Sequence, residues 1–278
     1  MTSALSAPRG AAACQARPVR RIHRALPAAA LCCVGALLTG CGLLQPASPT
    51  TTVTDASGHE TTLSWADFPG EQHDEPADVL AAPRAERVER FGAELLDDLR
   101  RSVDDVAPGL AWETGVEGGV FEHGGNGYGG HSLHRTYNSP DVSTAELPDD
   151  WDALTAALEA ELAQHGFEPI IWDFEREPFA HQTAAEHDAE VVEVHGSLDP
   201  AEMWRWIGSA SNGTVWVSVI LIDVERGVGA PPDADRQSPQ MLALMVGATV
   251  IDAADEAAYR AGTAPFEGLE RPETTHSD

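Results

Sequence analysis

The sequence has 278 residues and a strongly acidic composition, with 45 Asp and Glu against 17 basic residues and a formal net charge of −28. All of the basic residues are arginine, because the chain contains no lysine. An acidic excess of this size argues against nucleic-acid binding, which needs a basic face, and against lying flat on anionic lipid headgroups. A solvated, self-repelling surface is the simplest consequence.

The first 40 residues have the organisation of an export signal. Five arginines precede Ala25, and no acidic residue occurs before Cys41. An apolar run then extends from Ala25 to Leu38. This run is too short to span a bilayer and has the length of a signal-peptide core. We therefore predict that residues 1–40 are a signal peptide that is removed.

The segment Leu38-Thr39-Gly40-Cys41 resembles the lipobox of bacterial lipoprotein precursors. Small residues precede the cut, and the Cys41 thiol is expected to receive a diacylglyceryl group. Two or more acyl chains on one cysteine would anchor the protein stably at the extracytoplasmic face of the cell membrane. An uncleaved signal anchor and an ordinary secretory signal are the alternatives. Arg20-Arg21 leaves the choice between twin-arginine and general export open.

The other three cysteines lie in the predicted leader, so the lipidated mature chain has neither a free thiol nor a disulfide. Cleavage before Cys41 leaves 238 residues, with 12 Arg against 45 acidic residues and a formal net charge of −33. The stability of the mature chain must therefore come from a hydrophobic core. A chain of this length is long enough to build one good-sized domain.

Composition divides the mature chain into three parts. Residues 41–82 are rich in Pro, Thr and acidic residues, and are predicted to be a flexible tether after the lipidated cysteine. Within them, Thr52–Leu63 carries a hairpin signal around Ala56-Ser57-Gly58. Residues 83–262 are predicted to form a single domain, and residues 263–278 an acidic disordered tail.

Three helices are predicted in the domain. Apolar residues at spacings of three and four indicate a helix that begins near Pro83 and ends at Pro108-Gly109. A second amphipathic helix opens at Pro148-Asp149-Asp150 and ends at Gly166. Residues 239–262 are predicted to form the last helix.

Strand predictions rest on runs of β-branched and aromatic residues. Leu110–Thr114, Ser132–Asn138, Pro169–Phe174 and Ala189–His195 are short candidates. Thr214–Asp223 is the strongest candidate and the predicted central strand. The order of these elements predicts an α+β fold, in which helices cover one face of a mainly antiparallel sheet in a two-layer sandwich.

This layout resembles the LppA-like family of actinobacterial lipoproteins over about residues 85–223. The shared features are the lipobox, a helix that ends in Pro-Gly with Trp112 shortly after, a helix that closes on Gly166-Phe167, and a strand preceded by glycine. The resemblance is one of pattern, without a sharp motif. It implies an exported lipoprotein but no particular activity.

A glycine-rich segment places Glu122, His123, His131 and His134 within one stretch of 13 residues. Imidazole nitrogens and a carboxylate suit Zn²⁺ or Cu²⁺, and a flexible loop could gather them on one ion. The spacing matches no established metal motif, however, and a solvent-exposed loop is the favoured interpretation. No metal or other cofactor is therefore predicted.

Two further groups of side chains suggest sites less strongly. Trp204 and Trp206 could contact a ligand, because Trp is enriched at binding hot spots. Their alternation is also explained by one buried face of a strand, which is the favoured interpretation. Asp173, Glu175 and Glu177 alternate in the same way, as at a solvated strand end.

The sequence contains no motif of a serine hydrolase or a zinc protease, so no catalytic residue is assigned. We predict a membrane-anchored extracytoplasmic lipoprotein whose domain binds an envelope component or a protein partner without catalysis. The alternative is a metal-binding protein or a metal-dependent enzyme that uses His123, His131 and His134. Convergence of these histidines beside buried acid would favour the alternative.

Overall fold

The computed structural model describes residues 46–227, 229–230 and 239–275 of the chain. The predicted signal peptide and the predicted lipidation site, Cys41, therefore lie outside the described residues. Within the described residues, no helix is both long enough and apolar enough to cross a membrane.

The fold is built on one antiparallel sheet of eight strands. Their spatial order is β3-β6-β10-β9-β8-β7, with β5 also paired to β10 and β4 paired to β5. The long strand β10 reaches β6 with its first half and β5 with its second half. The strands are β3 (Trp112–Thr114), β4 (Gly119–Glu122), β5 (His134–Asn138), β6 (Val142–Thr144), β7 (Ile171–Trp172), β8 (Arg205–Asn212), β9 (Val215–Asp223) and β10 (Gln240–Ile251).

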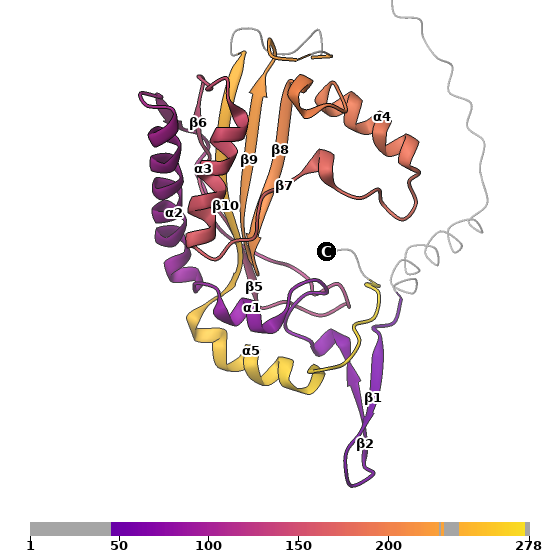
Figure 1. The fold of residues 1–278 in the computed structure, drawn as a ribbon. Coiled ribbons are helices and arrows are strands. Elements are labelled where there is room, and N and C mark those ends of the chain that lie inside the picture. Colours follow the sequence, from indigo (N-terminus) through magenta and orange to yellow (C-terminus); the bar gives the residue numbers. More distant parts are fainter. Residues whose placement is uncertain (1–45, 228, 231–238, 276–278) are drawn as a thin grey trace, which may run out of the picture. The chain divides into compact units, whose positions relative to one another are not determined.

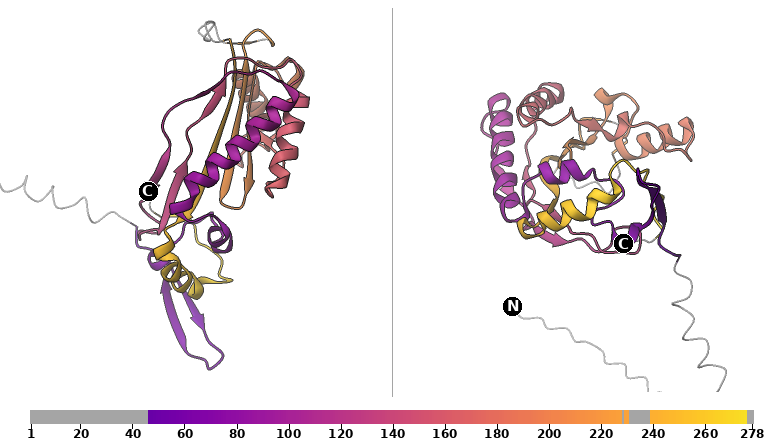
Figure 2. Two further views of the ribbon diagram at one scale, coloured as in Figure 1. Left: turned by 90° about the vertical axis from the view of Figure 1, so that its left-hand side faces the viewer. Right: turned by 90° about the horizontal axis from the view of Figure 1, so that it is seen from below.

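Helices α2 (Ala85–Val106) and α3 (Trp151–Gln164) lie side by side on one face of this sheet (Figures 1 and 2). Helix α4 (Ala184–His195) packs beside β8. The short helices α1 (Pro76–Ala81) and α5 (Glu256–Thr263) lie together at one end of the sheet, as Figure 2 shows from below. The predicted α+β sandwich is confirmed.

The core lies between the sheet and the two long helices. Every second residue of β9 is buried, as is expected for a strand with one covered face. These side chains belong to the same buried cluster as the apolar faces of α2 and α3. In the register of the sheet, the buried residues Val217, Val219 and Leu221 lie opposite Val246, Leu244 and Leu242.

Two predicted helices and the predicted central strand are confirmed. Helix α2 ends at Val106, just before the Pro108-Gly109 pair. Helix α3 begins after Asp150, whose side chain accepts a hydrogen bond from the backbone of Ala153. The strong periodicity of α2 and the Asp150 cap of α3 made these helices predictable.

The predicted strand Ala189–His195 is wrong, because these residues form the second half of α4. The helix starts at a capping box in which Thr183 and Glu186 satisfy each other's backbone groups. It ends at Gly196, which adopts the left-handed conformation. The β-branched pair inside the segment is too short to override these two signals.

The predicted last helix, residues 239–262, is also wrong over its first half, which is strand β10. A central strand buries both faces, so its continuous apolar sequence does not distinguish strand from helix. Gly247 was the informative residue. A Cβ atom there would lie 2.1 Å from the ring of Trp216 on β9, so glycine is required for this cross-strand packing.

The predicted tether, residues 41–82, is wrong for most of its described part. Its hairpin is confirmed, since β1 (Thr50–Thr54) pairs with β2 (Glu60–Ser64). Beyond the hairpin, the side chains of Trp65, Phe68 and Val79 are buried. Their partners are distant in sequence, which is why local composition did not reveal this packing.

The predicted acidic tail, residues 263–278, is folded as far as Thr275. Phe266 is buried against Trp65 and Phe68, at ring-centroid distances of 4.8 and 5.4 Å. The backbone of Thr275 donates a hydrogen bond to the carbonyl oxygen of Gly127. The folded unit therefore extends beyond both predicted boundaries, at Pro83 and at residue 262.

Candidate functional site

The glycine-rich segment between β4 and β5 is held in place by the buried side chain of Asn126. Its amide nitrogen donates hydrogen bonds to the carbonyl oxygens of Trp65 at 3.0 Å and Phe68 at 2.7 Å. Gly130 packs on the same segment, because a Cβ atom there would lie 1.7 Å from the carbonyl oxygen of Ala66. The prediction of a solvent-exposed loop is therefore wrong for residues 126–128, which are buried.

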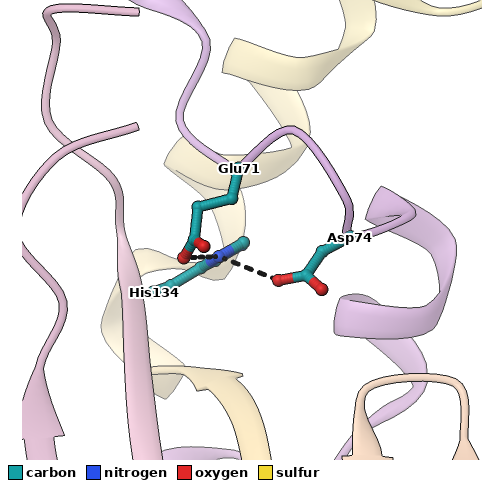
Figure 3. Close-up of side chains that lie close together, drawn as sticks. All are labelled: Glu71, Asp74 and His134. Carbon is teal, nitrogen blue, oxygen red and sulfur yellow. Dashed lines mark hydrogen bonds and ion pairs between the residues drawn. The ribbon is translucent and has the colours of Figure 1, made fainter. Parts of the chain in front are cut away.

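The imidazole of His134, the first residue of β5, meets two carboxylates. His134 is only 2% exposed. Its Nδ1 lies 3.1 Å from Oε1 of Glu71 and 3.4 Å from Oδ2 of Asp74 (Figure 3). One donor atom of each residue lies within 4.8 Å of the other two. We call Glu71, Asp74 and His134 the His134 cluster.

The second nitrogen of the His134 ring is also engaged. Its Nε2 lies 3.1 Å from the hydroxyl oxygen of Tyr259, a fully buried residue of α5. Burial raises the pKa of the Tyr259 phenol strongly, and the nearby Asp74 carboxylate raises it further. The hydroxyl therefore stays protonated and neutral at physiological pH.

Glu71 and Asp74 lie in the connection between the 3-10 helix η1 (Trp65–Asp67) and α1. The guanidinium of Arg271 holds this connection by donating hydrogen bonds to the carbonyl oxygens of Glu71 at 3.3 Å and Gln72 at 2.6 Å. Both carboxylates of the cluster thus lie in the segment predicted to be a tether, and the arginine that holds this segment lies in the predicted tail.

His123 contacts the cluster through Glu71. Its Nε2 lies 3.1 Å from Oε1 of Glu71, and its Nδ1 lies 3.5 Å from the hydroxyl of Thr136. One carboxylate oxygen of Glu71 therefore lies between the rings of His123 and His134. Two of the three histidines singled out in the sequence converge on the same acid.

The remaining candidates of the glycine-rich segment do not join them. His131 is exposed. Glu122 has a side chain that is 86% exposed and forms an ion pair with Arg135 at 2.8 Å. The acids of the site come instead from Glu71 and Asp74, more than 45 residues earlier in the chain.

Burial raises the pKa of the Asp74 carboxyl above its ordinary value, and the neighbouring Glu71 carboxylate adds to the rise. The charges of His134 and Arg271 act in the opposite direction. Burial and a like charge both disfavour ionised Asp74, so any cation held between the two carboxylates would be favoured electrostatically.

A second group of the same residue types lies between α2 and α3. The Nε2 of His165 is 3.2 Å from Oδ2 of Asp98 and 3.2 Å from Oε1 of Glu161. The three side chains are 20 to 29% exposed. We call this group the His165 cluster. Asp98 also forms an ion pair with Arg101, so this carboxylate of the His165 cluster already has a permanently charged cation beside it.

The tryptophans Trp204 and Trp206 are buried, and Trp206 belongs to the main hydrophobic core. The ring of Trp206 packs edge-on against Trp151 of α3, with 5.4 Å between ring centroids and 87° between ring planes. It contacts Trp172 of β7 in the same way. The Arg205 guanidinium lies 5.2 Å above the ring of Trp204.

The acids after Trp172 do not alternate on a strand. Strand β7 ends at Trp172, and Asp173–Glu175 form the 3-10 helix η2. Asp173 forms an ion pair with Arg176 at 3.0 Å. The expectation of a shared carboxylate face for Asp173, Glu175 and Glu177 is therefore wrong.

Among the side chains that the structure describes, the His134 cluster is the better supported candidate site, because a fully buried imidazole meets two carboxylates there. Comparison with known proteins finds no matching family model, no matching curated protein and no matching solved structure.

Proposed function

We propose that this protein is an extracytoplasmic lipoprotein that binds a cation at the His134 cluster. The observation that carries the proposal is the convergence of Glu71 and Asp74 on the Nδ1 atom of His134, at 3.1 and 3.4 Å. Like the prediction from the sequence, this proposal is one of binding without catalysis. It differs in the ligand, which we propose to be a cation and not an envelope component or a protein partner.

The charges around the cluster support a positively charged ligand. Two carboxylates approach each other where their side chains are only 25% and 22% exposed. Carboxylates removed from water need a cation or a hydrogen-bond donor close by. The guanidinium of Arg271 donates hydrogen bonds to backbone carbonyl oxygens of this connection and forms an ion pair with Glu75, at 3.6 Å.

The cellular location is a separate part of the proposal, and it rests on the lipobox. The leader, the apolar run and Cys41 occur in the order that lipoprotein processing requires. A diacylglyceryl group on Cys41 would hold the folded unit outside the cytoplasmic membrane. The cluster would then meet the ions of the extracytoplasmic space.

Replacing the proposed lipidation site tests this location. Cys41→Ser removes the thiol that carries the lipid, so we expect loss of palmitate labelling and release of the protein from the membrane fraction or a block in its maturation. The matched control is Cys33→Ser, which removes a thiol of the leader and should leave labelling unchanged. Labelling that persists in Cys41→Ser would contradict lipidation at this residue.

A further inference from the structure

We infer that the ion at the His134 cluster is a transition metal of the Zn²⁺ type, held by Glu71, Asp74 and the Nδ1 atom of His134, with one coordination position open. This inference rests on the proposed cation-binding function and names the class of ion. Tyr259 and His123 act as positioning residues, because each holds a ligand without contacting the ion.

The donor set selects among cations. Ca²⁺ and Mg²⁺ prefer oxygen ligands throughout, whereas Zn²⁺ and related ions accept imidazole nitrogen together with carboxylate oxygen. The Nδ1 atom of His134 lies 3.1 Å from Oε1 of Glu71. An ion held between the two carboxylates would therefore also contact this nitrogen. One imidazole with two carboxylates therefore favours a transition metal over either alkaline-earth ion.

The spacing of the donors fits a small ion. Zn²⁺ bonds to nitrogen and oxygen are about 2.0 to 2.1 Å long, which separates the ligand atoms of a tetrahedral site by about 3.3 Å. The distances from Nδ1 of His134 to the two carboxylate oxygens are 3.1 and 3.4 Å. An ion can therefore replace the hydrogen atom shared between these groups without a large movement of the backbone.

Tyr259 can accommodate the state of the imidazole that metal binding requires. A ligating histidine must carry its proton on the nitrogen that faces away from the metal. The Nε2–H group of His134 can donate to the Tyr259 hydroxyl at 3.1 Å, which leaves the lone pair of Nδ1 directed at Glu71 and Asp74. Burial of Tyr259 keeps this hydroxyl in one place.

His123 orients the first carboxylate. Its Nε2 atom lies 3.1 Å from Oε1 of Glu71. Outer contacts that orient ligating carboxylates are a regular part of metal sites. Glu71 is thus held from one side by His123 and from its backbone by Arg271.

The site has three protein ligands, which leaves one position for water or for a further ligand. Structural zinc sites have four protein ligands, whereas three ligands with an open position are typical of sites that exchange or react. The side chains of Glu71 and Asp74 are 25% and 22% exposed, so solvent reaches the carboxylates while His134 remains covered.

The test is a titration of the lipidated protein in detergent with Zn²⁺, followed by calorimetry, and with Co²⁺, followed by its absorption spectrum. We expect one equivalent of Zn²⁺ that is not displaced by excess Ca²⁺ or Mg²⁺. Glu71→Gln and His134→Asn should each lower Zn²⁺ affinity at least about 100-fold, because each removes a ligand. The matched control, His165→Asn, removes the same residue type from the His165 cluster and should leave affinity within about threefold.

The positioning role of Tyr259 has its own readout. Tyr259→Phe should weaken Zn²⁺ binding about 10-fold, within the usual range for such partners, and should keep one equivalent of bound metal. The Co²⁺ spectrum should keep its four-coordinate intensity but shift in wavelength. A purely structural role would change stability without moving this spectrum.

The remaining outcomes separate this inference from the proposed function. Tighter binding of Ca²⁺ than of Zn²⁺, lost in Glu71→Gln, would leave cation binding standing and overturn the assignment to a transition metal. Zn²⁺ binding that is lost only in His165→Asn would overturn the assigned site. Failure of the wild type to bind any of these cations would overturn both. If His134→Asn does not fold, as judged by circular dichroism, the isosteric Glu71→Gln decides.

Discussion

The His134 and His165 clusters contain the same side chains, one imidazole and two carboxylates, at nearly the same distances. Nitrogen to oxygen distances are 3.1 and 3.4 Å in the first, and 3.2 Å twice in the second. Their surroundings differ. The His134 side chain is fully buried, whereas that of His165 is 29% exposed.

The two clusters also differ in where their residues come from. The His165 cluster joins neighbouring helices, as ordinary interhelical ion pairs do. The His134 cluster joins a loop before α1 to the first residue of β5, with a residue of α5 behind the imidazole. Such an arrangement requires several segments to be held together, and burying its charged groups costs free energy. The contrast shows that burial and supporting contacts, more than distance, distinguish a candidate site from a surface ion pair.

The largest expected difference between the clusters is in stability without metal. His134→Leu removes the imidazole that contacts Glu71, Asp74 and the buried Tyr259 hydroxyl, and should lower the free energy of unfolding by about 2 to 4 kcal/mol. His165→Leu removes a partly exposed imidazole and should lower the free energy of unfolding by no more than about 1 kcal/mol. Urea unfolding in the presence of a chelator measures both. Equal losses would mean that burial does not separate the two clusters.

Much of the fold could be predicted because its signals are local. The amphipathic period of α2, the Asp150 cap of α3, the β-branched run of β9 and the turn between β1 and β2 each need only a short stretch of sequence. Strand β10 could not be identified in this way, because its continuous apolar sequence fits a buried helix equally well.

The candidate site was only half predictable. The sequence placed His123 and His134 in one segment, but the acids were expected within that segment, at Glu122. Glu71 and Asp74 come from a region whose composition resembles a tether, and only the long-range packing of Trp65 and Phe68 brings it to β5. Aromatic residues beside the acidic stretch were the available signal that this region is folded.

Removing one carboxylate should change the free energy of unfolding in opposite directions in the two clusters. The pKa of Asp74 is raised in the folded protein, so the folded state binds this proton more tightly and loses stability as the pH rises above the ordinary carboxyl value of 3.8. At pH 7, Asp74→Asn should therefore raise the free energy of unfolding of the metal-free protein.

The matched change, Asp98→Asn, breaks contacts with Arg101 and His165 and should lower the free energy of unfolding by about 0.5 kcal/mol. Urea unfolding with a chelator at pH 7 and pH 4 checks both signs. The gain from Asp74→Asn should shrink at pH 4, because the wild-type carboxyl then takes up its proton. A loss of stability in Asp74→Asn at pH 7 would contradict this account of the buried acid.

The smallest expected difference is in the response to salt. Double-mutant cycles isolate the coupling of Asp74 with His134 and of Asp98 with His165. Raising NaCl from 0.05 to 0.5 M shortens the screening length to a few ångströms and should remove most of the Asp98–His165 coupling, a change of less than about 0.5 kcal/mol.

The Asp74–His134 coupling should change less, because the imidazole is fully buried and bulk salt screens a buried group less than an exposed one. Chelator must be present in every measurement, since residual metal would add its own coupling to the buried pair. Equal salt responses would mean that solvent screens both pairs alike. The His134 cluster would then be as open as the His165 cluster, and its preference for holding an ion would lose its physical basis.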